Sequence, residues 1–155
     1  MNENEKNYVP GPEQDYVARA LLNWLNEYPD FPERVTGIES EYLSGKTSMG
    51  LFAIEAAYKT AEYISGAYEA QYQFALQYRV ATSGSGARLS AVEALGAIAS
   101  WAEWRSGEMD DPPEIGAGKR AASVERTSPA VMVARNADGS EDYQILMVMA
   151  YSVNP

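Results

Sequence analysis

One segment of the chain, Tyr68 to Val80, alternates strictly between two kinds of residue. Its even positions carry Tyr, Ala, Phe, Leu and Val, whereas its odd positions carry Glu, Gln, Ala and Arg. Side chains of a β-strand point to opposite faces in turn, so the pattern predicts one strand with an apolar face and a polar, almost uncharged face. The strand is roughly twice the usual length of about five to six residues. Such a strand favours an extended sheet that frames a ring or tube over a fold built around a small-molecule pocket.

The residue types that are missing narrow the chemistry open to the chain. It contains no cysteine and no histidine. This excludes disulfides, thiolate nucleophiles, imidazole acid–base catalysis and the commonest zinc ligands. The N-terminal residues are polar, and no apolar run approaches ~20 residues. We therefore expect neither a signal peptide nor a membrane span, and synthesis in the cytoplasm.

The net charge of the chain argues against nucleic acid as a binding partner. The 155 residues include 12 Lys and Arg against 22 Asp and Glu, for a net charge of −10. The imbalance is steepest over residues 1–45, which hold nine acidic residues against Lys6, Arg19 and Arg34. A phosphate backbone would be repelled by such a surface. We expect no specific binding of nucleic acid, although an acidic surface past which DNA slides remains compatible.

The spacing of apolar residues divides the rest of the chain into helices and strands. Steps of three and four residues, bounded by prolines and glycines, predict helices over about 13–28 and 87–105. Alternation predicts strands over 35–43, 51–58 and 61–64 that lead into the long strand as an antiparallel meander, and a last hairpin of 123–135 with 142–153. Residues 1–12 resemble a flexible tail, and residues 106–118, rich in Pro, Gly and acids, a mobile loop.

This order predicts a single α+β domain over residues 13–155, in which helices pack on one face of a mostly antiparallel sheet. The core face is expected to be apolar on both long strands, through Tyr72, Phe74, Leu76, Ile145, Met147 and Met149. The last strand is unusual because its second face is half apolar as well, through Leu146, Val148 and Ala150. Such a strand is either covered twice within its domain or covered by a partner subunit.

Candidates for catalysis or ligand binding are weak. Residues 83–86 (SGSG) precede a helix but lack the lysine of a phosphate-binding loop, and a flexible turn explains them better. The carboxylate pairs Glu39/Glu41 and Asp110/Asp111 are explained as solvated acidic surface rather than as a hydrolase or cation site. Trp101 and Trp104, spaced by three on a helix, indicate packing. The sequence therefore predicts no catalysis, no metal and no cofactor.

Four segments together carry a family resemblance: LLNWLNEYPDFP, YISGAYEAQYQFALQYR, LGAIASWAEW and DGSEDYQILMVMAYSVNP. Over about residues 20–155 the chain resembles the minor capsid proteins of bacteriophages and prophages of Gram-positive bacteria, and it is similar to tail terminator proteins. The resemblance implies a structural virion protein of the head–tail or tail-end region, made in the bacterial cytoplasm. It also implies an α+β fold that assembles as a hexameric ring on the tail tube, beside head–tail connector proteins, with DNA passing through.

Two surfaces are expected to make the contacts with other subunits or with the tube. One surrounds Leu146, Val148 and Ala150, and the other is the acidic loop with Asp110, Asp111 and Glu114. The loop is expected to become ordered only on contact, and the isolated protein to be monomeric. The alternatives are a monomeric module that binds a small ligand or a protein, recognisable by a pocket with convergent polar groups, and a hydrolase with two facing carboxylates.

Overall fold

The computed structural model describes residues 10–54, 58–81 and 85–154. In sequence order these residues form α2 (Pro10–Leu25), β1 (Ile38–Ser40), β2 (Ser48–Ala53), β3 (Lys59–Glu62), β4 (Tyr68–Val80), α3 (Ser85–Ser106), β5 (Lys119–Arg126), β6 (Val131–Arg135) and β7 (Glu141–Val153). All of these strands belong to one sheet, in which β1 alone pairs in parallel. The prediction of an α+β fold with a mostly antiparallel sheet is confirmed.

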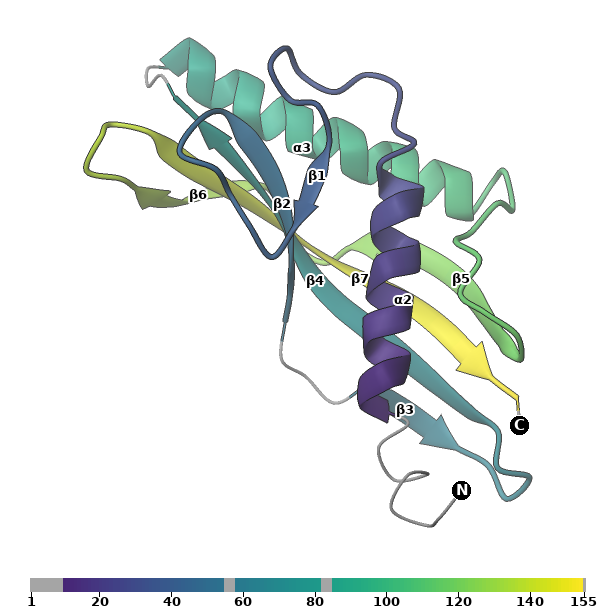
Figure 1. Cartoon of the computed structure of the whole chain (residues 1–155). Coiled ribbons are helices and arrows are strands. Elements are labelled where there is room, and N and C mark those ends of the chain that lie inside the picture. Colours follow the sequence, from purple (N-terminus) through teal and green to yellow (C-terminus); the bar gives the residue numbers. More distant parts are fainter. Residues whose placement is uncertain (1–9, 55–57, 82–84, 155) are drawn as a thin grey trace.

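The two long strands β4 and β7 form the centre of the sheet. They pair antiparallel over their whole length, from Tyr68 opposite Val153 to Val80 opposite Glu141. Figure 1 shows this ladder as the long diagonal of the molecule, in teal and yellow. The predicted bounds of the first strand are confirmed, and the second begins one residue earlier than predicted. Because every residue of one strand faces a residue of the other, side chains on both faces lie in two aligned rows.

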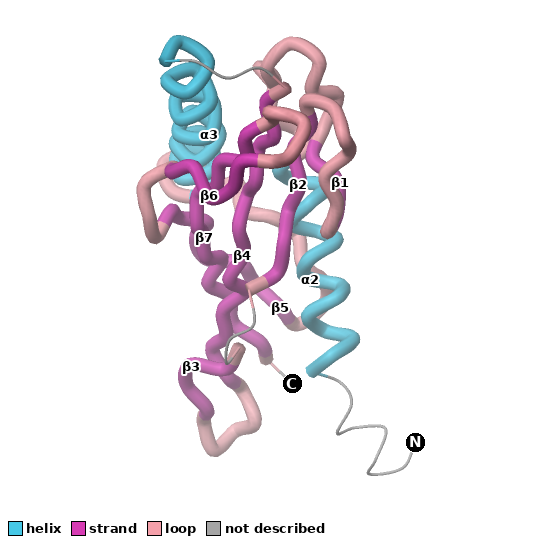
Figure 2. Tube along the Cα trace, turned by 90° about the vertical axis from the view of Figure 1, so that its left-hand side faces the viewer, coloured by secondary structure: helices cyan, strands magenta, loops and turns pink. Residues whose placement is uncertain are grey.

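Two shorter strands pair with the outer edge of each long strand. β2 and β3 lie one after the other along β4, so the predicted meander is wrong. β5 and β6 likewise lie one after the other along β7. The expected single strand over 123–135 is interrupted at residues 127–130, where Pro129 has no N–H to donate to a ladder. The hairpin of β3 with β4 extends beyond the first turn of α2 at the lower end of the molecule (Figure 2).

Both helices pack on the same face of the sheet and bury one side of the long strands. The buried row includes all six predicted core residues, Tyr72, Phe74, Leu76, Ile145, Met147 and Met149, none more than 5% exposed. Val17 and Leu21 of α2 and Leu95 and Ile98 of α3 complete this core. Figure 1 shows α2 lying in front of the long strands and α3 running over the upper part of the sheet. The predicted arrangement of helices on one face is therefore confirmed.

The first helix begins and ends earlier than the predicted range of 13–28. Residues 1–9 of the predicted tail lie outside the described residues, whereas residues 10–12 belong to α2. Beyond Leu25 the chain tightens into a turn, because the N–H groups of Glu27 and Tyr28 donate to the carbonyls three residues back, at 3.2 and 3.1 Å. The Asn26 Oδ1 accepts a hydrogen bond from the backbone N–H of Ile38 at 2.7 Å, and its Nδ2 donates to the carbonyl of Ile38 at 3.1 Å. This pair of bonds attaches the end of α2 to β1.

Candidate assembly surfaces

The second face of the β4–β7 ladder, here called the open face, carries neither helix. Its rows are Gln71, Gln73, Ala75 and Gln77 on β4, opposite Ala150, Val148, Leu146 and Gln144 on β7. The Gln77 Nε2 donates to the Gln144 Oε1 across the strands at 3.0 Å. The predicted contact residues Leu146, Val148 and Ala150 are thus neighbours on one surface, and they are half-buried by the side chains around them. None of the three belongs to the core cluster or packs against it.

Charged residues stand only at the margins of this open face. At one end Arg79 and Asp142 neutralise each other through two hydrogen bonds, of 2.8 and 3.0 Å. At the other end Glu69 lies opposite Ser152, and Glu125 of β5 lies beside Val148. The rows between these margins carry no charge over four consecutive cross-strand pairs. In a chain with a net charge of −10, this is a surface that another copy can approach without strong repulsion.

The acidic loop after α3 is anchored, which corrects the prediction that it is mobile on its own. Ile115 is 1% exposed and belongs to the core cluster. The backbone N–H groups of Gly107, Met109 and Asp111 donate to carbonyls of the last turns of α3. The sequence pattern of prolines, glycines and acids hid this, because one buried isoleucine outweighs the polarity of its neighbours.

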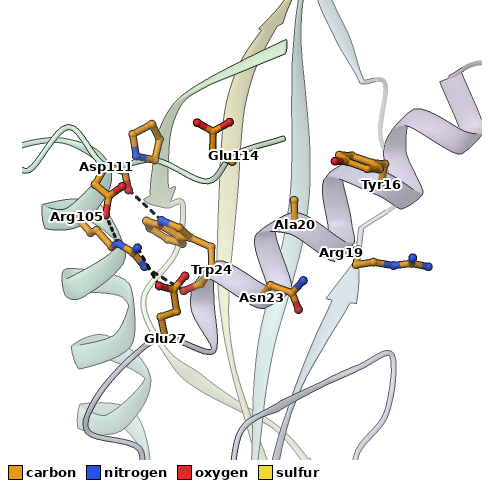
Figure 3. A pocket seen from close by; sticks show the side chains of 10 residues that line it. Tyr16, Arg19, Ala20, Asn23, Trp24, Glu27, Arg105, Asp111 and Glu114 are labelled. Carbon is orange, nitrogen blue, oxygen red and sulfur yellow. Dashed lines mark hydrogen bonds and ion pairs between the residues drawn. The ribbon is translucent and has the colours of Figure 1, made fainter. Parts of the chain in front are cut away.

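The loop is also held by Arg105, which lies beside Trp24 near the end of α3 (Figure 3). The Arg105 guanidinium lies 4.9 Å from the ring centre of Trp24 and 5.3 Å from that of Trp101. Its Nε is 2.9 Å from the Asp111 Oδ2, and its Nη2 is 3.3 Å from a carboxylate oxygen of Glu27. The Trp24 Nε1 donates to the carbonyl of Asp111 at 2.9 Å. Trp101 therefore packs, as predicted, and Asp111 is committed within the subunit.

The other two acidic candidates of this loop are available for contact. Asp110 and Glu114 are exposed, and neither is within ion-pair distance of a cation in the described part of the chain. The structure thus separates the three carboxylates into one that stabilises the loop and two that face outward. The loop and the open face lie on different sides of the sheet, because the loop packs with the helices.

A buried carboxylate that the sequence did not reveal joins α3 to the last hairpin. Glu141, at the start of β7, has no exposed surface. It accepts hydrogen bonds from Arg88 of α3 at 3.1 Å, from Arg135 of β6 at 2.7 Å and from the Tyr143 hydroxyl at 3.1 Å. The hydrogen bonds from Arg88 and Arg135 lower its pKa to about 2, although burial acts in the opposite direction. Arg88 lies 53 positions from Glu141, so no local sequence pattern links the two.

A second buried carboxylate attaches the start of α2 to both long strands. Glu13 accepts hydrogen bonds from the hydroxyls of Tyr68 on β4 and Tyr151 on β7. Burial and this hydrogen bond raise the pKa of both tyrosines, so both hydroxyls remain donors. In the first turn of α2 its negative charge also interacts favourably with the helix macrodipole.

The carboxylates considered as catalytic or metal-binding groups are not brought together in the described structure. Within residues 10–54, 58–81 and 85–154, no group of three or more Asp and Glu stands where it could hold a metal ion. Glu39 and Glu41 are both exposed, and the Glu41 carboxylate accepts a hydrogen bond from the Ala53 N–H at 2.8 Å. The other carboxylate pair is Asp110 with the committed Asp111. Neither helix of the described part is long and apolar enough to cross a bilayer.

Comparison with known proteins supports the architecture through structure alone. No protein-family model matches the chain, and no curated protein matches it in sequence. Among solved structures, the fold is similar to that of a protein chain in the virion of a native gene transfer agent particle, with a TM-score of 0.55. The match covers 90% of this chain and 93% of that chain, at 12% sequence identity. The two chains therefore share a fold over nearly their whole length.

Proposed function

We propose that this chain is a non-catalytic structural virion protein: a tail terminator that closes the end of a phage tail tube as a ring of six copies. The proposal combines the family resemblance of four sequence segments with the fold shared with a chain of a gene transfer agent virion. The observation that carries it is the uncovered, uncharged face of the long ladder in an otherwise acidic molecule. Such a face fits a contact between protein chains better than a solvated surface of an acidic monomer.

The ring supplies partners for the surfaces described above. A closed ring is built from a head-to-tail interface, so each subunit presents two different patches. The open face around Leu146, Val148 and Ala150 serves as one contact surface toward a neighbouring subunit or the tube, and the loop with Asp110 and Glu114 as another. Residual negative charge around the channel lets DNA pass without sticking. The head–tail connector is the expected neighbour on the other side of the ring.

A charge placed on the open face tests this function. In the phage or prophage that encodes the chain, Val148→Lys is expected to give unjoined or overlong tails beside intact heads in electron micrographs of lysates. Burial in an interface would remove water from the new ammonium group and from Glu125 beside it, whereas the free chain leaves both side chains room to reach water. Deleting the acidic loop is not a suitable test, because it would also remove Ile115 from the core.

Leu89→Lys provides the matched control. Leu89 lies on α3 and is 61% exposed, outside both proposed surfaces. This variant is expected to give normal tails. If the Val148→Lys phage gives tails of uniform length joined to heads, the proposed function is wrong.

A further inference from the structure

A hollow of about 530 Å³ lies beside the loops that precede and follow β1. Arg34 and Lys46 line it, together with backbone and hydroxyl groups from residues 44–48 and the single acid Glu39. Both cationic side chains are exposed. The hollow therefore carries a local excess of positive charge on a molecule whose net charge is −10. Val35 of its lining belongs to the core, but the hollow is part of neither surface described so far.

These two cations differ from most others in the chain. Six basic residues form ion pairs with carboxylates of the same subunit: Lys59, Arg79, Arg88, Arg105, Arg126 and Arg135. Among the residues that the structure describes, no carboxylate is within ion-pair distance of Arg34 or Lys46. With acids nearly twice as numerous as bases, two unpaired cations in one hollow are available for a negative partner.

The acidic loop has the complementary property. Asp110 and Glu114 are exposed and unpaired within the described chain, and even the nearby Lys119 and Arg120 are not within ion-pair distance of them. The loop also lies apart from the hollow. In Figure 1 the loop leaves the right-hand end of α3, whereas the blue segment between β1 and β2 lies left of centre, with the hairpin of β6 and β7 still farther left. The chain thus presents opposite charges at two separate places.

We propose that the hollow around Arg34 and Lys46 of one subunit receives the loop around Asp110 and Glu114 of the next copy of this chain. The inference rests on the proposed ring and names the charged part of its interface. Copies with a charge of −10 repel one another, so contact between patches of opposite sign selects both the partner surface and the direction of the ring. Such a head-to-tail contact closes a ring only when the two patches differ, as they do here.

Charge reversal tests the contact. The fraction of tail tubes that carry a ring is counted in electron micrographs. We expect this fraction to fall at least ten-fold in each of the double variants R34E/K46E and D110K/E114K. Each places like charges opposite one another at the contact, where like-charge juxtaposition is costly. R19E/R120E and D15K/E93K are the matched controls: they change the net charge by the same −4 and +4 at exposed positions outside the hollow and the loop, and both are expected to assemble normally. Far-UV circular dichroism and the thermal midpoint of each purified variant show whether it still folds.

Combining the two variants separates this contact from any other role of the same residues. A phage carrying both alleles produces two kinds of chain. The acidic hollow of R34E/K46E fits the basic loop of D110K/E114K, and the native loop of R34E/K46E fits the native hollow of D110K/E114K. Rings are expected to return in the mixture. The chain with all four substitutions restores the net charge of −10 and is also expected to assemble. Milder R34Q/K46Q and D110N/E114Q pairs give the same comparison if a reversal variant does not fold.

The outcomes decide between the contact and the ring itself. Normal rings from R34E/K46E alone would overturn the contact while leaving the proposed ring intact. Loss that the second allele does not rescue would also overturn it, because the hollow would then bind something other than the loop, such as a phosphate group of nucleic acid. The proposed ring itself would be contradicted by a different result, in which the parent protein forms no rings on tail tubes.

Discussion

Phe74 occupies the middle of the buried row of β4 and has no exposed surface. Phe74→Ala is expected to reduce the free energy of unfolding by about 3–5 kcal/mol, since it leaves a cavity between the sheet and the helices. Chemical denaturation of the purified chain measures this. Gln73→Ala, one position away on the open face, is the control and is expected to change stability little. A loss below ~1 kcal/mol for Phe74→Ala would show that the faces of β4 are assigned the wrong way round.

Glu141 makes stability depend on pH in a defined direction. Its pKa is about 2 in the folded chain, against a usual value of 4.5. Because the folded state binds the proton less readily, this stabilisation is complete above the unfolded pKa and is lost as the pH falls toward the folded pKa. We expect the thermal midpoint to fall between about pH 5 and about pH 2.5, and to fall less in Glu141→Gln, which is already destabilised at neutral pH.

Glu93→Gln is the control for this titration, because Glu93 is exposed on α3 and has no ion-pair partner in the described chain. It should reproduce the parent curve. A Glu141→Gln curve parallel to the parent over the same pH range would contradict the role given to the Arg88–Glu141–Arg135 cluster.

Ile115, buried with Pro113, anchors the loop between α3 and β5. Ile115→Ala is expected to cost about 2–5 kcal/mol, the usual range for a buried isoleucine. It should also expose residues 107–118 to limited proteolysis in the native state. Glu114→Ala, at the exposed neighbouring position, should do neither. Rapid cleavage of the loop in the unchanged chain would restore the original prediction that it is mobile.

Local alternation and helical periodicity were enough to predict the long strands, both helices and the face on which they pack. The reason is that period-two burial depends only on neighbours along the chain, as Phe74 and Met147 illustrate. Pairing partners were harder to predict. That β2 and β3 share one edge of β4 depends on contacts across the sheet, and the residues of the Glu141 cluster lie up to 53 positions apart.

The candidate surfaces also differ in how far the sequence could predict them. The row of Leu146, Val148 and Ala150 follows from alternation alone, and the structure places all three on the open face. For the acidic loop, composition identified exposed Asp110 and Glu114 but not the arginine that engages Asp111, because Arg105 reaches it through the fold of the helix end. The basic hollow was missed altogether, since Arg34 and Lys46 meet only when the loops around β1 fold together.

The whole molecule is a long, twisted ladder with helices on one side, an uncharged face on the other, and charges of opposite sign at two separate loops. Each feature on its own is compatible with a monomer. Together they describe a subunit with several unsatisfied surfaces, which fits a repeated assembly better than a solitary domain. In the proposed ring the like net charges weaken contacts between free copies, so we expect the protein to be monomeric in solution without a tail tube.

The ring is tested most directly by measuring how many copies of the purified chain bind to one purified tail tube. The chain is mixed with tubes, unbound protein is removed, and the mass added per tube is determined together with the position of the added density in electron micrographs. We expect six copies in a closed ring at one end of each tube, and a monomer in the absence of tubes. A single bound copy, binding along the whole tube, or no binding would contradict the proposed ring.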